Sequence, residues 1–242
     1  MIEALFLSTV RIRTFAGPCR LSNATGFFFE ANGVLQLITS RHVVLDEASG
    51  HRPDRIEIDL HMDRNDLGRF IGFSIPLYKD TLNVWREAKD DEGLVDVVAI
   101  DIDQAALPET AQIAAFRPGH LPAADAHVEI GQTLLAIGYP LGFQDTLHHL
   151  PLARHASLAS SYGLRFGGKG YFLIDARTHR GLSGAPVVMR DRNPPPDTSM
   201  PWYLLGVHSS RLEAFSRDPD HDEVLGLNAV WYSDVLHTLQ AE

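Results

Sequence analysis

The chain has 242 residues, of which 45% are hydrophobic and 21% are charged, a composition that is typical of folded globular proteins and excludes a disordered chain. Its 21 Lys and Arg against 31 Asp and Glu give a net charge of −10, which disfavours nucleic acid or an anionic membrane as a partner, because both attract basic surfaces. A single cysteine excludes an intrachain disulfide, no apolar run approaches about 18 residues, and no secretory signal pattern is present, so we expect a cytoplasmic protein.

Short apolar runs separated by turn residues predict β-strands rather than long helices in the first half of the chain. Two of these runs are joined through Ala31-Asn32-Gly33, and Asn-Gly between strands favours a hairpin, because both residues tolerate positive φ. Cys19 is expected to be a small buried hydrophobe. The strands predicted here cover residues 4–12, 25–30, 34–39, 55–61, 69–76 and 95–102.

An Ala- and Pro-rich stretch at 105–125 predicts a connector between two lobes, 1–104 and 126–232. The closing segment, 233–242, predicts a short helix capped by Ser233. The predicted fold is therefore all-β, with two six-stranded antiparallel β-barrels in one domain and a short C-terminal helix. The helix is expected to turn Val235, Leu236 and Leu239 toward the body, and the strands predicted in the second lobe cover 133–138, 155–160, 171–175, 185–189, 203–209 and 226–231.

Three residues of catalytic type stand in an informative order along the chain. His42 directly follows a strand, at the start of an expected helical turn, Asp96 opens an apolar strand, and Ser183 lies in the sequence Gly-Leu-Ser-Gly before another apolar strand. Each alone has an ordinary explanation, such as a packed histidine or a turn residue. The order His, Asp, Ser is one of those known for a catalytic triad. The chemistry requires these residue types, because a serine hydroxyl needs a histidine to take its proton and an aspartate to orient the imidazole.

The segments around these residues resemble those of the trypsin-like peptidases, and most closely the bacterial HtrA-like branch. The resemblance implies two β-barrels and a serine endopeptidase that forms an acyl-enzyme intermediate, with His42, Asp96 and Ser183 as its triad. It also implies an oxyanion hole formed by the backbone N–H groups of Gly181 and Ser183. The matching segments run in order from about residue 24 to 236 and read TGFFFEANGVLQLITSRHVV, DVVAIDI, IGYPLGF, IDARTHRGLSGAPVV, LLGVHSS and LGLNAVW.

The chain departs from this family at several positions. Leu182 stands just before Ser183, where the family has Asp or Asn, and a leucine cannot pair with a newly freed amino terminus, so activation by N-terminal cleavage is not expected. Ala185 replaces a usual glycine. No PDZ domain follows the last strand, so we expect an associated activator or targeting protein to deliver the protein or peptide substrate. No cofactor and no metal are expected.

The pocket for the side chain before the cut is expected to contain Arg177, Thr178, His208 and Ser209. The placement of Thr178 and His208 resembles glutamate-specific bacterial serine proteases and their glutamine-specific viral relatives. A hydroxyl and an imidazole donate hydrogen bonds to a carboxylate or carboxamide, and Arg177 would add positive charge. The hypothesis is cleavage after Glu or Gln, and its alternative is that His208 is a satisfied strand residue without a selective role. The acidic loop 211–224 is expected to overhang the pocket, where its charge disfavours acidic residues.

Other functions fit parts of the sequence. An α/β-hydrolase would combine Ser183 with His221 or His237, but its nucleophile elbow requires a final glycine that Gly-Leu-Ser-Gly-Ala lacks. A metal site is disfavoured because neither paired cysteines nor a His-Glu-x-x-His motif accompanies the closely spaced His148, His149 and His155. The strongest alternative is a catalytically silent pair of barrels that binds a peptide or protein along an exposed strand edge.

Overall fold

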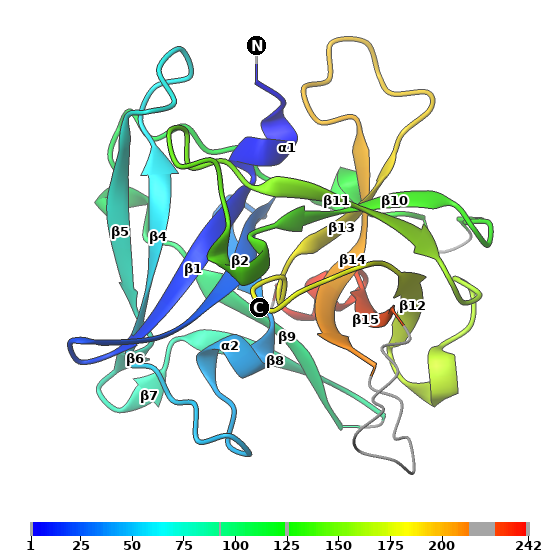
Figure 1. Ribbon diagram of the computed structural model, residues 1–242, viewed down its shortest axis with the longest axis horizontal. Helices are drawn as coiled ribbons and strands as arrows, with labels where there is room; N and C mark the ends of the chain where they lie inside the picture. Colours follow the sequence, from blue (N-terminus) through cyan, green and yellow to red (C-terminus); the bar gives the residue numbers. More distant parts are fainter. Residues whose placement is uncertain (1, 92, 124–125, 213–225, 241–242) are drawn as a thin grey trace.

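Most of the described chain forms two large β-sheets, one from each half of the sequence, which lie side by side in Figure 1. The computed structural model describes residues 2–91, 93–123, 126–212 and 226–240. Within these residues the second half closes into a six-stranded barrel, and the first half forms a larger curled sheet beside it. The predicted all-β, trypsin-like class is therefore confirmed. In the described part of the chain, no helix is both long and apolar enough to span a membrane.

The sheet of the first half is one strand larger than predicted. Its elements are α1 (Ala4–Leu7), β1 (Thr9–Ala16), β2 (Cys19–Ala31), β3 (Val34–Thr39), α2 (Arg41–Val44), β4 (Arg55–His61), β5 (Phe70–Pro76), β6 (Tyr78–Lys79), β7 (Leu82–Asn83), β8 (Trp85–Asp90) and β9 (Gly93–Asp101). Among the described residues it contains seven strands, in the order β5-β4-β1-β2-β3-β9-β8, while β6 and β7 pair separately. The extra strand is β8, whose sequence WREAKD is mostly charged and buries only Trp85 and Ala88, too few apolar residues for a recognisable pattern.

The start of the chain is helical where a strand was predicted. Residues 4–7 form the single turn α1, because the Ser8 amide donates to the Ala4 carbonyl at 3.0 Å and the Ser8 hydroxyl donates to the Leu5 carbonyl at 2.8 Å. Such local bonds compete with strand pairing. The prediction of a strand over 4–12 is therefore wrong for its first five positions and confirmed from Thr9 onward.

The second half contains the strands that periodicity predicted, with small shifts at their ends. Its elements are η1 (Gln104–Ala106), η2 (Pro118–His120), β10 (Thr133–Gly138), η3 (Pro140–Gly142), β11 (Leu152–Leu158), η4 (Phe166–Gly168), β12 (Tyr171–Asp175), β13 (Pro186–Arg190), β14 (Trp202–Arg211), β15 (Leu227–Tyr232) and α3 (Val235–Thr238). In the described residues the barrel order is β10-β11-β12-β15-β14-β13. The division into two lobes and a connector at 105–125 stays a prediction.

The C-terminal helix packs on the body as expected, but its cap was predicted wrongly. Asp234 is the residue that precedes α3, and the Ser233 amide instead donates to the Leu205 carbonyl of β14 at 3.1 Å. Leu236 and Leu239 are buried in the apolar cluster between the two sheets, and Val235 packs against it. The same cluster contains Phe27 and Phe29 from β2, Val97 from β9, Ile137 from β10 and Val207 from β14, so apolar side chains hold the two sheets together.

Two local predictions around β2 have opposite outcomes. Asn32 and Gly33 have φ values of 52° and 78°, so the predicted hairpin turn between β2 and β3 is confirmed. Cys19 was predicted to be buried, and this is wrong, because it is exposed at the outer end of β2. The β1–β2 hairpin extends beyond the apolar core there, so a small apolar side chain has nothing to pack against.

We expect Phe27→Ala to lower the free energy of unfolding by about 3–5 kcal/mol. Phe27 is fully buried, and its ring meets that of Phe116 edge to face at a centroid distance of 5.6 Å, so truncation leaves a cavity between the sheets. Urea denaturation followed by tryptophan fluorescence measures this change. The matched control is Phe143→Ala, whose side chain is 65% exposed and whose loss should change stability by less than about 0.5 kcal/mol. Equal effects of the two substitutions would contradict the assigned core.

Candidate active site

His42 and Asp96 form a closely bonded pair. His42 lies in the single turn α2, directly after β3, and Asp96 lies on β9, which pairs with β3. The carboxylate of Asp96 accepts the backbone N–H of His42 at 2.9 Å with Oδ1 and lies 2.7 Å from ring Nδ1 with Oδ2. Because an ionised carboxylate only accepts, Nδ1 carries the proton and Nε2 keeps its lone pair. This tautomer is the one that a general base requires.

The environment of His42 favours its protonated form. Burial acts to lower the pKa of the imidazole, but the hydrogen bond and the charge of Asp96, with a smaller effect of Asp46, more than offset this. The net result is a pKa raised above the ordinary value of 6.5. A raised pKa makes the imidazole a stronger base and stabilises the imidazolium that forms when it takes a proton.

Ser209 holds the other side of the Asp96 carboxylate. Its hydroxyl donates to Asp96 Oδ2 at 2.5 Å, so three donors converge on one carboxylate. Ser209 was also predicted to line the substrate pocket, and this stays a prediction for its backbone, because the side chain is bonded to Asp96. Its backbone carbonyl accepts the hydroxyl of Ser183 at 3.2 Å. Ser209 therefore lies between the carboxylate and the candidate nucleophile.

Ser183 lies on a tight loop between β12 and β13 that is packed against β2. The Ser183 carbonyl accepts the amide of Thr25 at 3.0 Å. The next residue, Gly184, has φ +83°, and a Cβ there would lie 2.2 Å from the Thr25 carbonyl oxygen, so only glycine allows this approach. In the described residues the Ser183 hydroxyl bonds to Ser209 and not to His42. The structure thus brings the predicted triad residues to one place with the serine turned toward β14.

The predicted oxyanion donors are free. Within the described chain, the amides of Gly181 and Ser183 have no hydrogen-bond acceptor, while the Gly181 carbonyl is held by the Thr25 hydroxyl at 2.7 Å. Gly181 has φ +97°, and a Cβ there would lie 2.5 Å from the Tyr139 carbonyl oxygen. Leu182 is fully buried, as expected, and its carbonyl accepts the amide of Ala185 at 2.9 Å. Two uncommitted donors beside a serine are suited to stabilising an oxyanion.

Thr178 and His208 both contact Asn228, a residue that the sequence analysis did not single out. The Thr178 hydroxyl donates to Asn228 Oδ1, and His208 Nε2 lies 3.3 Å from the same oxygen. Asn228 Nδ2 donates to the carbonyls of Ala176 and Gly226, each at 2.9 Å, which fixes the orientation of the amide. All three side chains are buried. The only sign of this residue in the sequence was that Asn228 is the one amide side chain within the otherwise apolar segment of β15.

Each ring nitrogen of His208 faces one oxygen atom. Nδ1 lies 3.1 Å from the Leu182 carbonyl, and Nε2 faces Asn228. Burial lowers the pKa of His208, which favours the neutral ring, and a neutral ring donates to only one of these acceptors. Arg177 does not join this group: it is exposed, and its carbonyl accepts Arg154 Nη2 at 2.7 Å. Residues 213–225, most of the loop predicted to overhang the pocket, lie outside the described residues.

Two of the three histidines considered for a metal site, His148 and His149, have carboxylate partners. His148 Nδ1 lies 2.6 Å from Asp145, and His149 Nδ1 lies 3.2 Å from Asp59. In the part of the chain that the structure describes, no group of three or more His, Cys, Asp or Glu side chains is arranged to hold a metal ion.

Comparison with known proteins identifies the family. Residues 24–193 match the family described as trypsin-like peptidase domain. The chain belongs to this family. Family membership supports a peptidase, that is, a hydrolase acting on peptide bonds, and confirms the resemblance seen in the segments around His42, Asp96 and Ser183. A search of curated proteins found no match.

Two solved structures show how the trypsin-like domain of this chain compares with those of bacterial proteases. The serine endoprotease from Yersinia pestis matches with a TM-score of 0.53 and 15% identity, over 96% of this chain and 61% of that one. The active form of the Rv3671c protease from M. tuberculosis matches with a TM-score of 0.53 and 17% identity, over 98% and 80%. At these identities the likeness shows the fold alone. This chain therefore spans about three fifths of the Yersinia protease.

We expect the pKa of His42, measured by NMR titration of its ring protons, to lie above 6.5 in the wild type and to fall in Asp96→Asn. The substitution removes the charge that raises the pKa and leaves the burial that lowers it. The resonance is assigned by its loss in His42→Gln. As a control, Asp103→Asn removes a carboxylate whose side chain only caps η1 and should leave the titration of His42 unchanged. An Asp96→Asn protein with an unaltered His42 pKa would contradict the assigned pair.

Proposed function

We propose that this chain is a serine endopeptidase in which Ser183 is the nucleophile, His42 the general base and Asp96 the residue that orients the imidazole. The observation that carries the proposal is the 2.7 Å contact of Asp96 with His42 Nδ1, which leaves Nε2 as the available base. Ser209 supports it, because it contacts both the Asp96 carboxylate and the Ser183 hydroxyl. Membership in the trypsin-like peptidase domain family agrees with this reaction.

Acylation begins when the Ser183 hydroxyl leaves the Ser209 carbonyl and rotates toward His42, a change between staggered side-chain rotamers. The proton passes from Oγ to Nε2 while Oγ attacks the carbonyl carbon of the substrate. The resulting oxyanion accepts hydrogen bonds from the amides of Gly181 and Ser183. The C–N bond then breaks, Nε2 returns the proton to the leaving amine, and water later hydrolyses the acyl-enzyme by the same path. Rotation also frees the Ser209 carbonyl to accept a backbone N–H of the substrate.

We propose a preference for Gln or Glu before the cut. The Thr178 hydroxyl donates to Asn228 Oδ1, and His208 offers a second donor at this position in the tautomer that carries its proton on Nε2. The side-chain oxygen of Gln or Glu is the same type of acceptor and would take or share this position. Because burial keeps His208 neutral, the pocket offers no full charge to a carboxylate, so Gln is favoured over Glu at neutral pH.

A protein or peptide substrate is the partner that this reaction requires. We also propose a cytoplasmic location, because a chain with one cysteine needs no oxidising compartment to fold. An associated protein that activates or delivers the enzyme remains part of the proposal. Its effect would be to favour the rotamer in which the Ser183 hydroxyl faces His42 instead of Ser209.

We expect a fluorophosphonate probe to label wild-type protein at Ser183 with one label per chain and to leave Ser183→Ala unlabelled. His42→Ala should label more slowly by a factor on the order of 10³ or more, because the hydroxyl then lacks its base. Mass spectrometry locates and counts the label. Ser74→Ala, on the exposed edge strand β5, is the matched control and should label at the wild-type rate.

The bond from Ser183 to Ser209 favours one competing function, a silent binding module. Absence of label in the wild type, with and without added peptide, would support that module and reject the peptidase.

In peptides that differ only in the residue before the cut, we expect kcat/KM to fall in the order Gln, Glu, Lys. Thr178→Val keeps the shape of the side chain but removes a donor, and it should reduce the ratio of Gln to Leu cleavage about 10-fold. Liquid chromatography of the products measures each rate. The exposed Thr110→Val is the matched control. Dominant cleavage after Lys, Arg or large apolar residues would reject the Gln or Glu preference.

A further inference from the structure

Ser183 lies between two strands that belong to different sheets. On one side its hydroxyl contacts β14 at Ser209, next to the Thr178 and His208 pocket. On the other side its carbonyl contacts β2 at Thr25. If the side chain before the cut enters the pocket beside β14, the side of Ser183 toward β2 is left for the chain after the cut. The residues around Thr25 on β1 and β2 therefore face the part of the substrate that departs.

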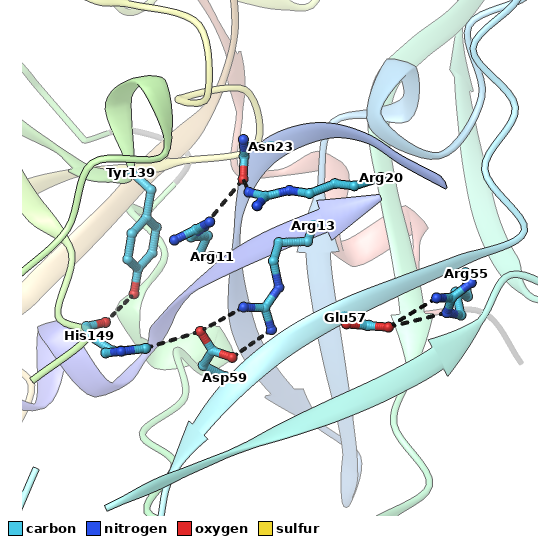
Figure 2. A network of polar contacts seen from close by, with 9 residues as sticks. All are labelled: Arg11, Arg13, Arg20, Asn23, Arg55, Glu57, Asp59, Tyr139 and His149. Carbon is cyan, nitrogen blue, oxygen red and sulfur yellow. Dashed lines mark hydrogen bonds and ion pairs between the residues drawn. The ribbon is translucent and has the colours of Figure 1, made fainter. Parts of the chain in front are cut away.

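Two arginines without a carboxylate partner lie on this side. Arg11 of β1 is directly opposite Thr25 in the strand register, so their side chains project from the same face of the sheet. Arg11 Nε donates to Asn23 Oδ1 at 3.3 Å, and Arg20 Nη2 donates to the same oxygen. Figure 2 shows both guanidinium groups turned to this single amide. Arg20 is exposed and Arg11 is half-buried.

The positive charge of this pair is not neutralised locally. The nearest carboxylate on the neighbouring strands, Asp59, already binds both Nη atoms of Arg13 at 2.6 and 3.3 Å and lies 3.2 Å from His149 Nδ1, as Figure 2 shows. Among the described residues, neither Arg11 nor Arg20 makes an ion pair. Burial, together with the charges of Arg20 and Arg13, lowers the pKa of Arg11, as expected where cations are crowded, although Asp59 acts in the opposite direction. In a chain with a net charge of −10, this is an unusual place for excess positive charge.

Exposed apolar side chains stand beside the arginines. Gly142 packs against Asn23, since a Cβ there would lie 3.2 Å from Asn23 Cγ. The flanking Leu141 and Phe143 are 69% and 65% exposed. The Leu141 amide donates to the Arg180 carbonyl at 2.5 Å, which connects this loop to the segment that leads into Gly181. We call the four side chains Arg11, Arg20, Leu141 and Phe143 the leaving-side surface.

We propose that the leaving-side surface binds the substrate segment that follows the cut, and that this segment carries acidic side chains next to apolar ones. Guanidinium groups bind carboxylates with paired hydrogen bonds, and Asn23 holds both of them in place for this. Leu141 and Phe143 offer apolar contact that a purely charged segment would leave unused. The proposal rests on the proposed peptidase function, because it assigns the direction in which a bound substrate leaves Ser183.

The test is a digest of proteome-derived peptides in which mass spectrometry maps each cut, with Ser183→Ala as the blank. We expect Asp or Glu to be enriched about 2- to 10-fold over Lys or Arg within the first three positions after the cut, as exposed ion pairs allow. The enrichment should shrink as salt is raised from about 0.05 to 0.5 M, because ions screen exposed charges. An unchanged ratio across this range, or no enrichment, would overturn the proposal.

Variants separate a specific surface from a general effect of charge. Arg11→Gln with Arg20→Gln should abolish the enrichment, and the single exposed change Arg20→Glu, which cannot disturb the core, should reverse it. The matched control is Arg69→Gln with Arg192→Gln, which removes two exposed arginines from other loops and should keep the enrichment. The measured quantity is the ratio of acidic to basic residues after the cut within the digest of each variant. A change in the overall rate of cleavage therefore does not change the result.

A binding experiment tests the surface without turnover. Fluorescein-labelled peptides of alternating Leu and Glu, or of alternating Leu and Lys, are titrated with Ser183→Ala and followed by fluorescence anisotropy. The acidic peptide should bind more tightly, and Arg20→Glu in the same background should remove the difference. If peptides are not cut but this difference is found, the peptidase function fails and the surface stands. If peptides are cut without acidic enrichment, the surface is wrong and the peptidase stands.

Discussion

The carboxylate of Asp96 is the interaction on which the site depends. It accepts the backbone and ring N–H groups of His42, from the sheet of the first half, and the hydroxyl of Ser209, from the barrel of the second half. An ionised carboxylate can only accept hydrogen bonds, so the Nδ1 atom of His42 that faces it must carry a proton. The backbone N–H of His42 and the hydroxyl of Ser209 hold the carboxylate in the orientation that selects this tautomer. The same contacts connect the two sheets at the point where Ser183 lies. The orientation of the His42 imidazole and the packing of the two sheets therefore depend on the same contacts.

Close backbone packing keeps the loop that carries Ser183 in place. Gly184 touches the Thr25 backbone, Gly181 touches that of Tyr139, and both have positive φ, so any side chain would push the loop away from β2 and η3. Leu182, the departure from the family pattern, adds an apolar anchor, because it is fully buried between these glycines. Its carbonyl also lies 3.1 Å from His208 Nδ1. The loop is therefore held by the burial of Leu182 and by backbone hydrogen bonds, at a position where the family pattern has Asp or Asn.

Ser183 has different environments on its two sides. Toward β14, a neutral and buried group of Thr178, His208 and Asn228 offers hydrogen bonds without charge. Toward β2, Arg11 and Arg20 offer charge at the surface. A buried neutral donor favours an uncharged acceptor, while an exposed guanidinium favours a carboxylate, so the two sides are suited to different parts of one substrate.

Features with local causes were predictable from the sequence. Alternating apolar residues predicted β3, β4, β10 and β12 at their observed positions, and Asn-Gly predicted the turn before β3, because strand periodicity and positive φ are properties of neighbouring residues. His42, Asp96 and Ser183 were candidates for another reason, because their order along the chain is one of those known for a catalytic triad.

Only the tertiary structure decided which groups meet. The contact of the Ser209 hydroxyl with Asp96 was not predicted, Asn228 was not singled out, and the Ser183 hydroxyl faces β14. These contacts join residues far apart in the chain, and they depend on strand register and side-chain rotamers. The sequence therefore determined which strands form and which residues are candidates for chemistry. The packing of one sheet on the other determined their partners, because a hydrogen bond needs a partner within about 3 Å and sequence order does not set that distance.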